Sequence, residues 1–315
     1  MSKTALLIST PYAFRNQASG GWLRSLQLYE LLAEAGFNVT HISASELGKH
    51  GSHDLICVVS FANASLLRRL RKRTDFLWYD STDSWKLTRK SLFRLDPKLE
   101  LIRFARDLLY SRRYKYSDLV TYCTLRDKMA DHVKSSKMLC IPNKIRVFPV
   151  ENDYGPRFVF VGPDDYEPNR KSIQFLIEIM QDPKLSMMKL HIYGNTVENS
   201  KFHNIVYHPW ATDGELYGKS DIHLVPVKHG AGMKYKTLVP LSLNLRVIST
   251  IEGAVGIAGN PNLIVVKNLD EFFQAMLDEA SNQDLMTEPL ESNSRLIYQF
   301  DESVLLHNLL HAFGN

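Results

Sequence analysis

The stretch Pro226–Ile257, PVKHGAGMKYKTLVPLSLNLRVISTIEGAVGI, contains the pattern that decides the fold. An apolar run over 221–227 predicts a buried strand, and a glycine-containing loop over 230–232 follows it. Apolar residues at helical spacing over 232–244 predict a helix, and the apolar run 245–250 predicts the next strand. A strand, a crossover helix and a further strand are the repeating unit of a parallel sheet.

The same alternation of strands and helices runs through the rest of the chain in two successive sets. The first set has apolar runs at 4–9, 38–43, 54–60, 75–80, 118–124 and 138–144, and the second at 157–162, 189–194, 205–210, 221–227 and 245–250. We therefore expect an α/β protein with two Rossmann-like, doubly wound domains, 1–150 and 155–297. A hinge is expected at 151–156. We expect an amphipathic helix at 301–313, within 298–315, to return to the first domain.

Composition and cysteine usage bound the class of protein. Hydrophobic residues make up 44% and charged residues 23%, as in folded rather than disordered chains. No apolar run reaches the ~18–20 residues of a membrane-spanning helix, and the short run 4–14 predicts a first strand rather than a signal peptide. Cys57, Cys123 and Cys140 are far apart and lack metal-ligand spacing. This favours a reducing compartment, and we expect a cytoplasmic protein.

Positive charge is concentrated in one segment. The formal net charge is +4, yet residues 65–115 hold fifteen Lys and Arg against six Asp and Glu. We call 68–115 the basic segment. Such a segment suits an anionic acceptor or the inner face of a membrane, and less well nucleic acid. The alternative is a pair of solvated helix faces.

Two of the loops expected at carboxyl ends of strands give weak signals for a ligand site. Ligands of open α/β sheets bind at these ends. The pair Gly20-Gly21 precedes the first long helix, where bare backbone N–H groups can approach an anion. Lys171 lies in the loop that leads into a second helix. A simple glycine turn and a surface lysine are the respective alternatives.

The third loop gives the strongest signal. Gly230 and Gly232 precede Lys234 and Lys236, which fall in the first turn of a predicted helix. Cations in a first turn oppose the helix dipole, so helix stability does not favour two lysines there. Glycines, N–H groups and ammonium groups together form a cradle for a diphosphate. We therefore expect a phosphate-binding site in this loop.

This third loop also resembles a known family. One branch of the retaining GT-B glycosyltransferases of family four reads G-S-G-hydrophobic-R-hydrophobic-K-hydrophobic-L-E-A, then G-x-P-V-V-S-T and G-A-E-G-L. The stretch 230–257 matches without a gap, with Lys234 on the arginine and Lys236 on the lysine. Three other matches are FVGPDDYEPN at 160–169 with F-V-G-S-M-x-W-x-P-N, Ile141-Pro142-Asn143 with I-P-N, and Gly20-Gly21-x-x-Arg24 with a glycine loop and arginine.

The resemblance implies the GT-B fold, in which two Rossmann-like domains face a central cleft. It implies an acceptor on the first domain and a UDP- or GDP-sugar donor on the second, with no bound cofactor or metal. Transfer of the hexosyl or pentosyl group would retain its configuration, with lysines neutralising the leaving diphosphate. The residues so assigned to the donor are Gly20, Gly21, Lys171, Gly230, Gly232, Lys234, Lys236, Thr250, Gly253 and Ala254.

The candidates for catalysis are Lys234, Asp80 and Asp83. The two aspartates end the predicted strand 75–80 and its loop, where they are expected to touch the acceptor. Capping of a helix that begins near residue 84 is the equal alternative. His191, His208 and His229 are interpreted as structural or loop histidines.

The chain departs from the family pattern at four positions. Ala231 and Val239 replace a pair of glutamates that contact the donor, Val255 replaces an acid, and Pro163 replaces an arginine. We therefore expect altered or weakened donor binding. Three functions stay open: transfer to a lipid-linked or polysaccharide glycan, transfer to protein or modified DNA, and binding of a partner by a catalytically degenerate GT-B protein.

Overall fold

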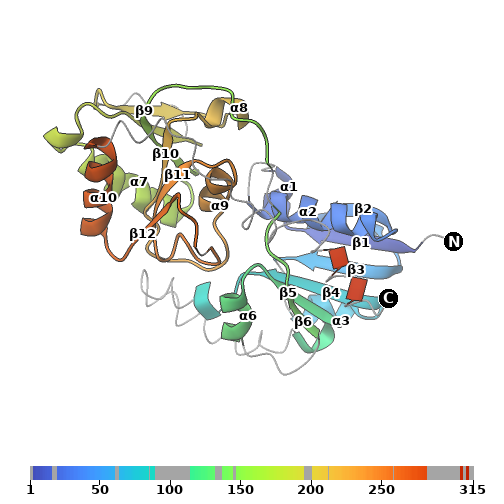
Figure 1. Ribbon diagram of the computed structural model, residues 1–315. Helices are drawn as coiled ribbons and strands as arrows, with labels where there is room; N and C mark the ends of the chain where they lie inside the picture. Colours follow the sequence, from blue (N-terminus) through green and yellow to red (C-terminus); the bar gives the residue numbers. More distant parts are fainter. Residues whose placement is uncertain are drawn as a thin grey trace. The chain divides into compact units, whose positions relative to one another are not determined.

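The computed structural model describes residues 3–15, 20–60, 64–84, 86–88, 114–131, 137–144, 147–194, 201–211, 213–257, 259–281, 306–307 and 310–311. The chain divides into two compact units, which Figure 1 shows coloured along the sequence. The first consists of Met1–Lys144, Ala231–Met233 and Gln299–Asn315, and the second of Ile145–Gly230 and Lys234–Tyr298. Each unit is built on its own six-stranded sheet.

The first sheet is parallel throughout and has the strand order β2-β1-β3-β4-β5-β6. Its strands are β1 (Thr4–Ser9), β2 (Asn38–Ser43), β3 (His53–Val59), β4 (Thr74–Thr82), β5 (Leu119–Tyr122) and β6 (Lys137–Cys140). The order reverses direction between β1 and β3, which makes the sheet doubly wound.

The second sheet is also parallel and has the order β12-β11-β10-β7-β8-β9. Its strands are β7 (Arg157–Val161), β8 (Leu190–Tyr193), β9 (Ile205–His208), β10 (Asp221–Val225), β11 (Arg246–Thr250) and β12 (Leu263–Val266). This is the order of a Rossmann domain, and it reverses between β7 and β10.

Helices connect the strands of both sheets. The first unit has α1 (Pro11–Arg15), α2 (Gly20–Glu34), the 3-10 helix η1 (Ala44–Lys49), α3 (Ala64–Leu70) and α6 (Leu125–Asp131). The second has α7 (Glu167–Ile179), the 3-10 helix η3 (Pro183–Leu185), α8 (Asp213–Leu216), α9 (Tyr235–Ser242) and α10 (Leu269–Ser281). Within the described residues, no helix has the length and apolar character needed to cross a bilayer.

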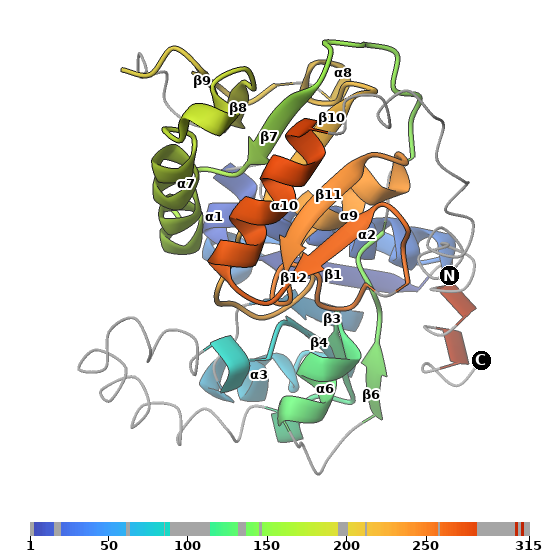
Figure 2. The ribbon, with the colours of Figure 1, turned by 60° about the vertical axis from the view of Figure 1, so that its left-hand side comes forward.

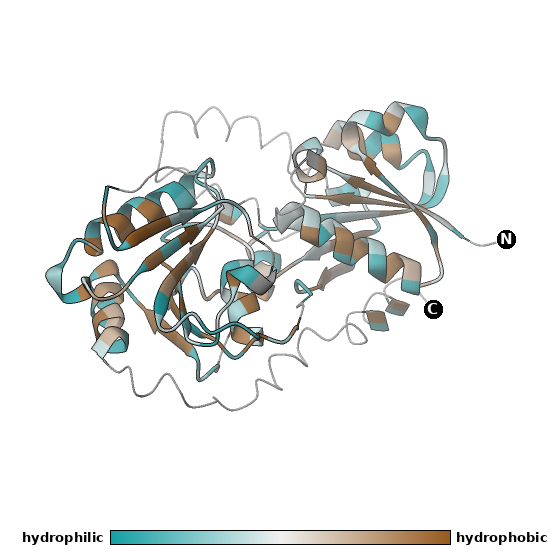
Figure 3. Ribbon diagram, turned by 90° about the horizontal axis from the view of Figure 1, so that it is seen from above, coloured by the Kyte–Doolittle hydropathy of each residue, from teal (hydrophilic) through white to brown (hydrophobic). Residues whose placement is uncertain are grey.

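Both faces of the strands β1, β3 and β5 of the first sheet are largely buried, which is why these strands consist mainly of apolar residues. Along β1, Ala5 and Leu7 pack with α2, whereas Leu6 and Ile8 pack with α3 on the opposite face. Strands covered on both sides have no position at which a polar residue would meet water. Figure 3 shows the same hydrophobic character along the strands of both sheets.

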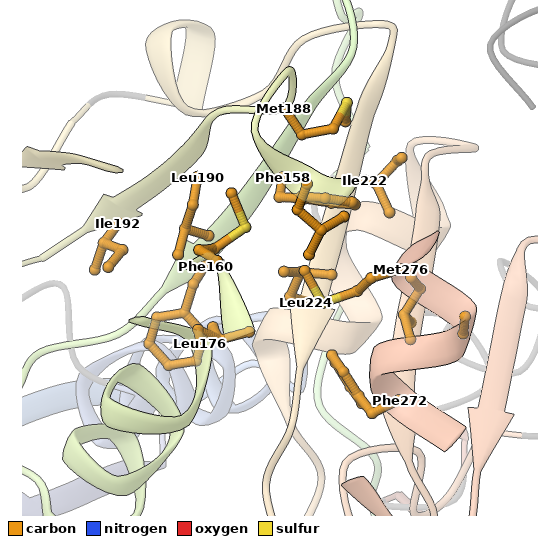
Figure 4. Packing of buried hydrophobic residues seen from close by; sticks show 14 of the residues in the cluster. Phe158, Phe160, Leu176, Met188, Leu190, Ile192, Ile222, Leu224, Phe272 and Met276 are labelled. Atoms are coloured by element: carbon orange, nitrogen blue, oxygen red, sulfur yellow. The ribbon is translucent and has the colours of Figure 1, made fainter. Parts of the chain in front are cut away.

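The core of the second unit lies between its sheet and the helices α7 and α10. Phe158 and Phe160 of β7 meet Leu176 of α7 and Phe272 of α10 on this face (Figure 4; the helices are labelled in Figure 2). The other face carries α9, whose Val239 packs against a second apolar cluster that includes Val159 and Leu243. Because β7 is buried from both sides, the loop that follows it starts from a fixed point.

The α/β class and the two doubly wound sheets are confirmed. The structure adds α1, α6, β12 and α10, which were not predicted, and the predicted helix 232–244 is shorter. Residues 89–113 lie outside the described part, and residues 114–116 form a 3-10 turn. Of the helix expected at 301–313, residues 306–307 and 310–311 are described as helical, and Leu306 packs against the α2 face of the first core. Its other residues lie outside the described part.

Candidate functional site

Two loops flank the point at which the strand order of the second sheet reverses. β7 ends at Val161 and leads through Gly162 into α7, and β10 ends at Val225 and leads through the glycine loop into α9. Doubly wound sheets bind ligands in the crevice beyond their carboxyl ends at such a point. The geometry therefore directs attention to the start of α7 and the start of α9.

Lys236, the second residue of α9, reaches across to α7. Its Nζ donates a hydrogen bond to Asn169 Oδ1 at 2.6 Å and lies 4.5 Å from the centre of the Phe160 ring. Desolvation of the ammonium group, and after it the charge of Lys234, lower the pKa of Lys236 from 10.5 to about 7. An anion placed beside this group would favour its charged form.

Gly162 makes this approach possible. Its φ is +154°, a value that side-chain-bearing residues rarely adopt. A β-carbon on this residue would lie 2.6 Å from Asn169 Nδ2 and 2.9 Å from Lys236 Nζ. Backbone without a side chain therefore lies directly beside the ammonium group, at the end of β7.

Lys234 directly precedes the first turn of α9. It occupies the N-cap position, and α9 has no acidic residue in its first turn. A β-carbon on Gly230 would lie 3.1 Å from Lys234 Nζ, so this lysine also extends over a glycine. Two cations at a helix N-terminus add to the positive potential of its N–H groups. Gly232 has φ +70°, which requires glycine, and its part in binding stays a prediction.

Thr250, Gly253 and Ala254 build a turn instead of presenting donors to a ligand. The Thr250 hydroxyl donates to the Val227 carbonyl and accepts the Gly253 N–H at 3.2 Å. The Ala254 N–H donates to the Thr250 carbonyl at 3.1 Å, and the Thr237 hydroxyl donates to the Gly253 carbonyl at 2.8 Å. These hydrogen bonds tie α9 to β11, and the direct contacts of the three residues with a donor stay a prediction.

Lys171 lies on the exposed side of α7. Its side chain is 51% exposed, and its Nζ is 3.5 Å from the Glu167 carboxylate one turn earlier. Arg170 also pairs with Glu167. Lys171 is thus a surface lysine in an ion pair, and its predicted contact with phosphate stays a prediction.

Gly20 and Gly21 are not in a loop. They are the first two residues of α2, and the Gly21 carbonyl accepts a hydrogen bond from the Ser25 hydroxyl at 2.8 Å. The loop expected around them is replaced by α1 and the start of α2, with residues 16–19 outside the described part. Only the position of the pair, at a helix N-terminus beyond β1, matches the expectation.

Asp80 is part of a buried ion pair. Both it and Arg24 have 0% exposed side chains, and Arg24 donates to the two carboxylate oxygens from Nε at 3.1 Å and from Nη2 at 2.7 Å. Thr82 and Thr121 donate to the same oxygens at 2.9 and 2.5 Å. Arg24 also donates to the Pro142 carbonyl at 3.2 Å. In this structure Asp80 is a buried carboxylate that stabilises the first unit, and its predicted contact with an acceptor stays a prediction.

Asp83 follows β4 and is partly buried. The alternative role of capping the next helical turn falls to Ser84, whose hydroxyl accepts the Leu87 N–H at 3.2 Å. The preceding Thr82 has φ +59° and is hydrogen-bonded at 2.7 Å to Ser60, which has φ +60°. A left-handed backbone conformation is uncommon for residues other than glycine, and such residues are often found near active or ligand-binding sites. Asp83 is thus the candidate of the pair that keeps access to solvent.

The histidines of the second sheet are structural. His191 Nδ1 lies 2.9 Å from His208 Nε2, and the two rings stack. Burial lowers the pKa of His191 to about 4, with the neighbouring Arg157 charge acting in the same direction. His208 shows the same direction of shift for the same two causes. Both rings are therefore neutral at physiological pH.

Sequence reasoning missed several buried polar groups because their partners are distant in the chain. Arg157 forms a bidentate pair with Asp221 at 2.7 and 3.0 Å, and Asp131 accepts from Ser84, Tyr114 and Tyr122. Asn169 was visible as part of a motif, but its lysine partner was not. Over the part of the chain that the structure describes, no three metal-ligating side chains converge; metal independence stays a prediction.

Comparison with known proteins settles the fold. No protein-family model and no curated protein sequence matches the chain. Solved structures do match. HepE from Anabaena, solved with UDP and glucose, has a TM-score of 0.65 at 10% identity over 99% of both chains. Trehalose 6-phosphate synthase from Burkholderia multivorans has a TM-score of 0.61 at 11% identity over 99% of this chain and 98% of that one.

The chain has the GT-B fold. A structure of S. aureus TarM with UDP also matches, with a TM-score of 0.60 and 12% identity over 83% of this chain. The match covers 55% of the TarM chain, so this chain spans about half the length of that protein. At these identities the likeness concerns the fold, so activity has to be inferred from the site.

Proposed function

We propose that this protein is a glycosyltransferase that uses a nucleotide-sugar donor, bound at the carboxyl edge of the second sheet. The observation that carries the proposal is the Lys236 ammonium group held against Gly162 at the strand-order reversal. Lys234 adds a second cation at the N-cap of the same helix. A diphosphate has the charge and the size to engage both lysines.

The chemistry follows from where charge develops. When the bond between the anomeric carbon and the donor phosphate breaks, negative charge grows on the departing diphosphate. Two ammonium groups beside that oxygen stabilise the transition state more than the ground state. In a retaining reaction, the acceptor oxygen bonds to the same face of the anomeric carbon, and its proton passes to the leaving phosphate. We propose this course, without a metal, for transfer of a hexosyl or pentosyl group.

The missing glutamates shift donor recognition toward the diphosphate. Ala231 and Val239 offer no carboxylate to a sugar hydroxyl, and Val239 packs into an apolar cluster. Hydrogen bonds to charged groups contribute about 1.5–3 kcal/mol each, so their absence weakens recognition of the sugar and ribose. We therefore expect UDP or GDP to contribute most of the affinity and the sugar to contribute little.

Calorimetric titration tests the proposal. UDP, GDP and their sugars are titrated into the protein and into the Lys234→Ala and Lys236→Ala variants. Loss of one charge-assisted contact should weaken nucleotide binding by roughly 1.5–3 kcal/mol. Equal affinity in the wild type and both variants would show that the nucleotide binds elsewhere.

The acceptor is proposed to be anionic or held at an anionic surface, such as a lipid-linked or polysaccharide glycan at the inner face of a membrane. Five basic residues of α3 and its following turn are exposed; they are Arg68, Arg69, Arg71, Lys72 and Arg73. Two of them have structural partners, because Arg71 donates to the Thr74 and Asp75 carbonyls and Arg73 to the His50 carbonyl. Most of the basic segment beyond residue 88 lies outside the described residues.

Sedimentation with vesicles tests this acceptor proposal. Each basic residue near an anionic surface contributes about 1 kcal/mol. Reversing the charges of Arg68, Arg69 and Lys72 should release the protein from phosphatidylglycerol vesicles, and salt should do the same. Binding to duplex DNA rather than to vesicles would favour a nucleic-acid acceptor. Binding to neither would favour the alternative that the basic residues only form solvated helix faces.

The second candidate function is binding of a partner protein by a GT-B fold without catalysis. The replacement of both donor glutamates by Ala231 and Val239 is the observation that favours it. Hydrolysis or transfer from any of a panel of nucleotide sugars would exclude this alternative, because a degenerate protein would release no nucleoside diphosphate.

A further inference from the structure

Asn169 is a buried polar residue with both ends of its amide in use. It belongs to the first turn of α7, and 5% of its surface is exposed. Its Nδ2 donates to the Pro163 carbonyl at 2.9 Å, and its Oδ1 accepts from Lys236 Nζ at 2.6 Å. A buried amide bonded at both ends has one orientation only. The oxygen therefore faces the lysine.

The partner of this oxygen, Lys236, has a side chain that a hydrogen bond can hold in one position. A lysine has a flexible four-carbon stem, and fixing it is costly in conformational entropy. The Phe160 ring, 4.5 Å from Nζ, supports the ammonium group from the core side. Asn169 takes one of the three N–H donors, which leaves two for an anion.

Gly162 completes the arrangement from a third segment. The amide and the ammonium group both lie where a β-carbon on this residue would stand, at 2.6 and 2.9 Å. Residues from the end of β7, the first turn of α7 and the first turn of α9 thus converge on one point. This point lies at the reversal of the strand order, where ligands of such sheets bind.

We infer that Asn169 is a positioning residue for the donor diphosphate, which acts by fixing the Lys236 ammonium group over Gly162. The inference rests on the proposed function and names a residue that the sequence left without a role. A neutral amide suits this task better than a carboxylate. A carboxylate at 2.6 Å would neutralise the lysine and repel a diphosphate.

A double-mutant cycle tests whether Asn169 acts through Lys236. UDP and pyrophosphate are titrated calorimetrically into the wild type, Asn169→Ala, Lys236→Met and the double variant. We expect UDP to bind about tenfold more weakly to Asn169→Ala, because this variant lacks the charge-assisted hydrogen bond that fixes the Lys236 ammonium group. We expect the double variant to bind as weakly as Lys236→Met and no more weakly, because residues that share one interaction are not additive.

Asn204→Ala is the matched control. Asn204 is also 5% exposed and donates from Nδ2 to a backbone carbonyl, that of Met180, at 2.8 Å. It belongs to the same unit, and its side-chain hydrogen bond goes to a backbone carbonyl rather than to a lysine. Its loss should lower the melting temperature much as Asn169→Ala does while leaving UDP affinity unchanged.

A second readout needs no nucleotide. The pKa of Lys236 is measured by NMR of the ¹³Cε-labelled lysines, and Asn169→Ala should lower it, because the amide oxygen stabilises the charged form. An unchanged pKa, or additive losses of UDP affinity in the cycle, would overturn the inference even if UDP binds. Failure of the wild type to bind any nucleotide or pyrophosphate would instead overturn the proposed function.

Discussion

The buried pair of Arg24 and Asp80 allows the sharpest prediction about stability. Both side chains are fully buried, and Arg24 makes two hydrogen bonds to the carboxylate. Replacing Asp80 by Asn keeps the shape and leaves the arginine charge buried without its counter-charge. Removal of one partner from such a pair costs about 3–5 kcal/mol. For a unit of this size, that corresponds to a fall in melting temperature of roughly 10 °C.

Differential scanning calorimetry is the assay, because two units can unfold in separate transitions. The Arg24→Met/Asp80→Asn double variant should regain part of the loss, since no unpaired charge stays buried. Asp54→Asn is the control, because Asp54 is an exposed carboxylate of the same unit that bonds to Thr4. If the melting temperature of Asp80→Asn fell no further than that of the control, the stabilising role of the buried pair would be refuted.

Three further predictions concern the second unit. UDP affinity should fall as pH rises from 7 to 9, because Lys236, with a pKa of about 7, loses the positive charge that attracts the diphosphate. Calorimetric titrations at four pH values would show a constant affinity if Lys236 were not involved. Gly162→Ala should weaken UDP binding at least tenfold, since its β-carbon would displace the amide and the ammonium group; wild-type affinity would exclude the tight packing. Gly253→Ala should cost about 1–3 kcal/mol in a urea unfolding experiment, because its β-carbon would lie 2.3 Å from Ser249 Oγ; an unchanged midpoint would contradict the packing of that turn.

The alternation of apolar runs was enough to predict two doubly wound sheets. Strands such as β1 have an unbroken apolar run, Ala5 to Ile8, because both of their faces are covered, and such a run can be recognised from the sequence alone. The strand β12 and the helix α10 were missed although α10 has apolar residues at helical spacing. The helix α1 is only five residues long and lies in a region with turn-forming residues, so its pattern is too short to read.

The roles of individual residues were harder to predict than the elements that carry them. Asp80 ends the strand predicted at 75–80, where an acceptor contact would be expected, but its partner Arg24 lies 56 positions away in the sequence. Thr250 and Gly253 match a donor motif, yet their groups close a turn against Val227 and Thr237. Pairings of this kind depend on which segments the fold brings together, and a single sequence contains no record of them.

The most direct test of the account is a crystal structure of the protein with UDP. We expect diphosphate oxygens within hydrogen-bond distance of Lys236 Nζ, beside Gly162 and the first turn of α9, with Asn169 still bonded to the same ammonium group. UDP bound away from the ends of β7 and β10, with Lys236 making no contact with phosphate, would contradict it.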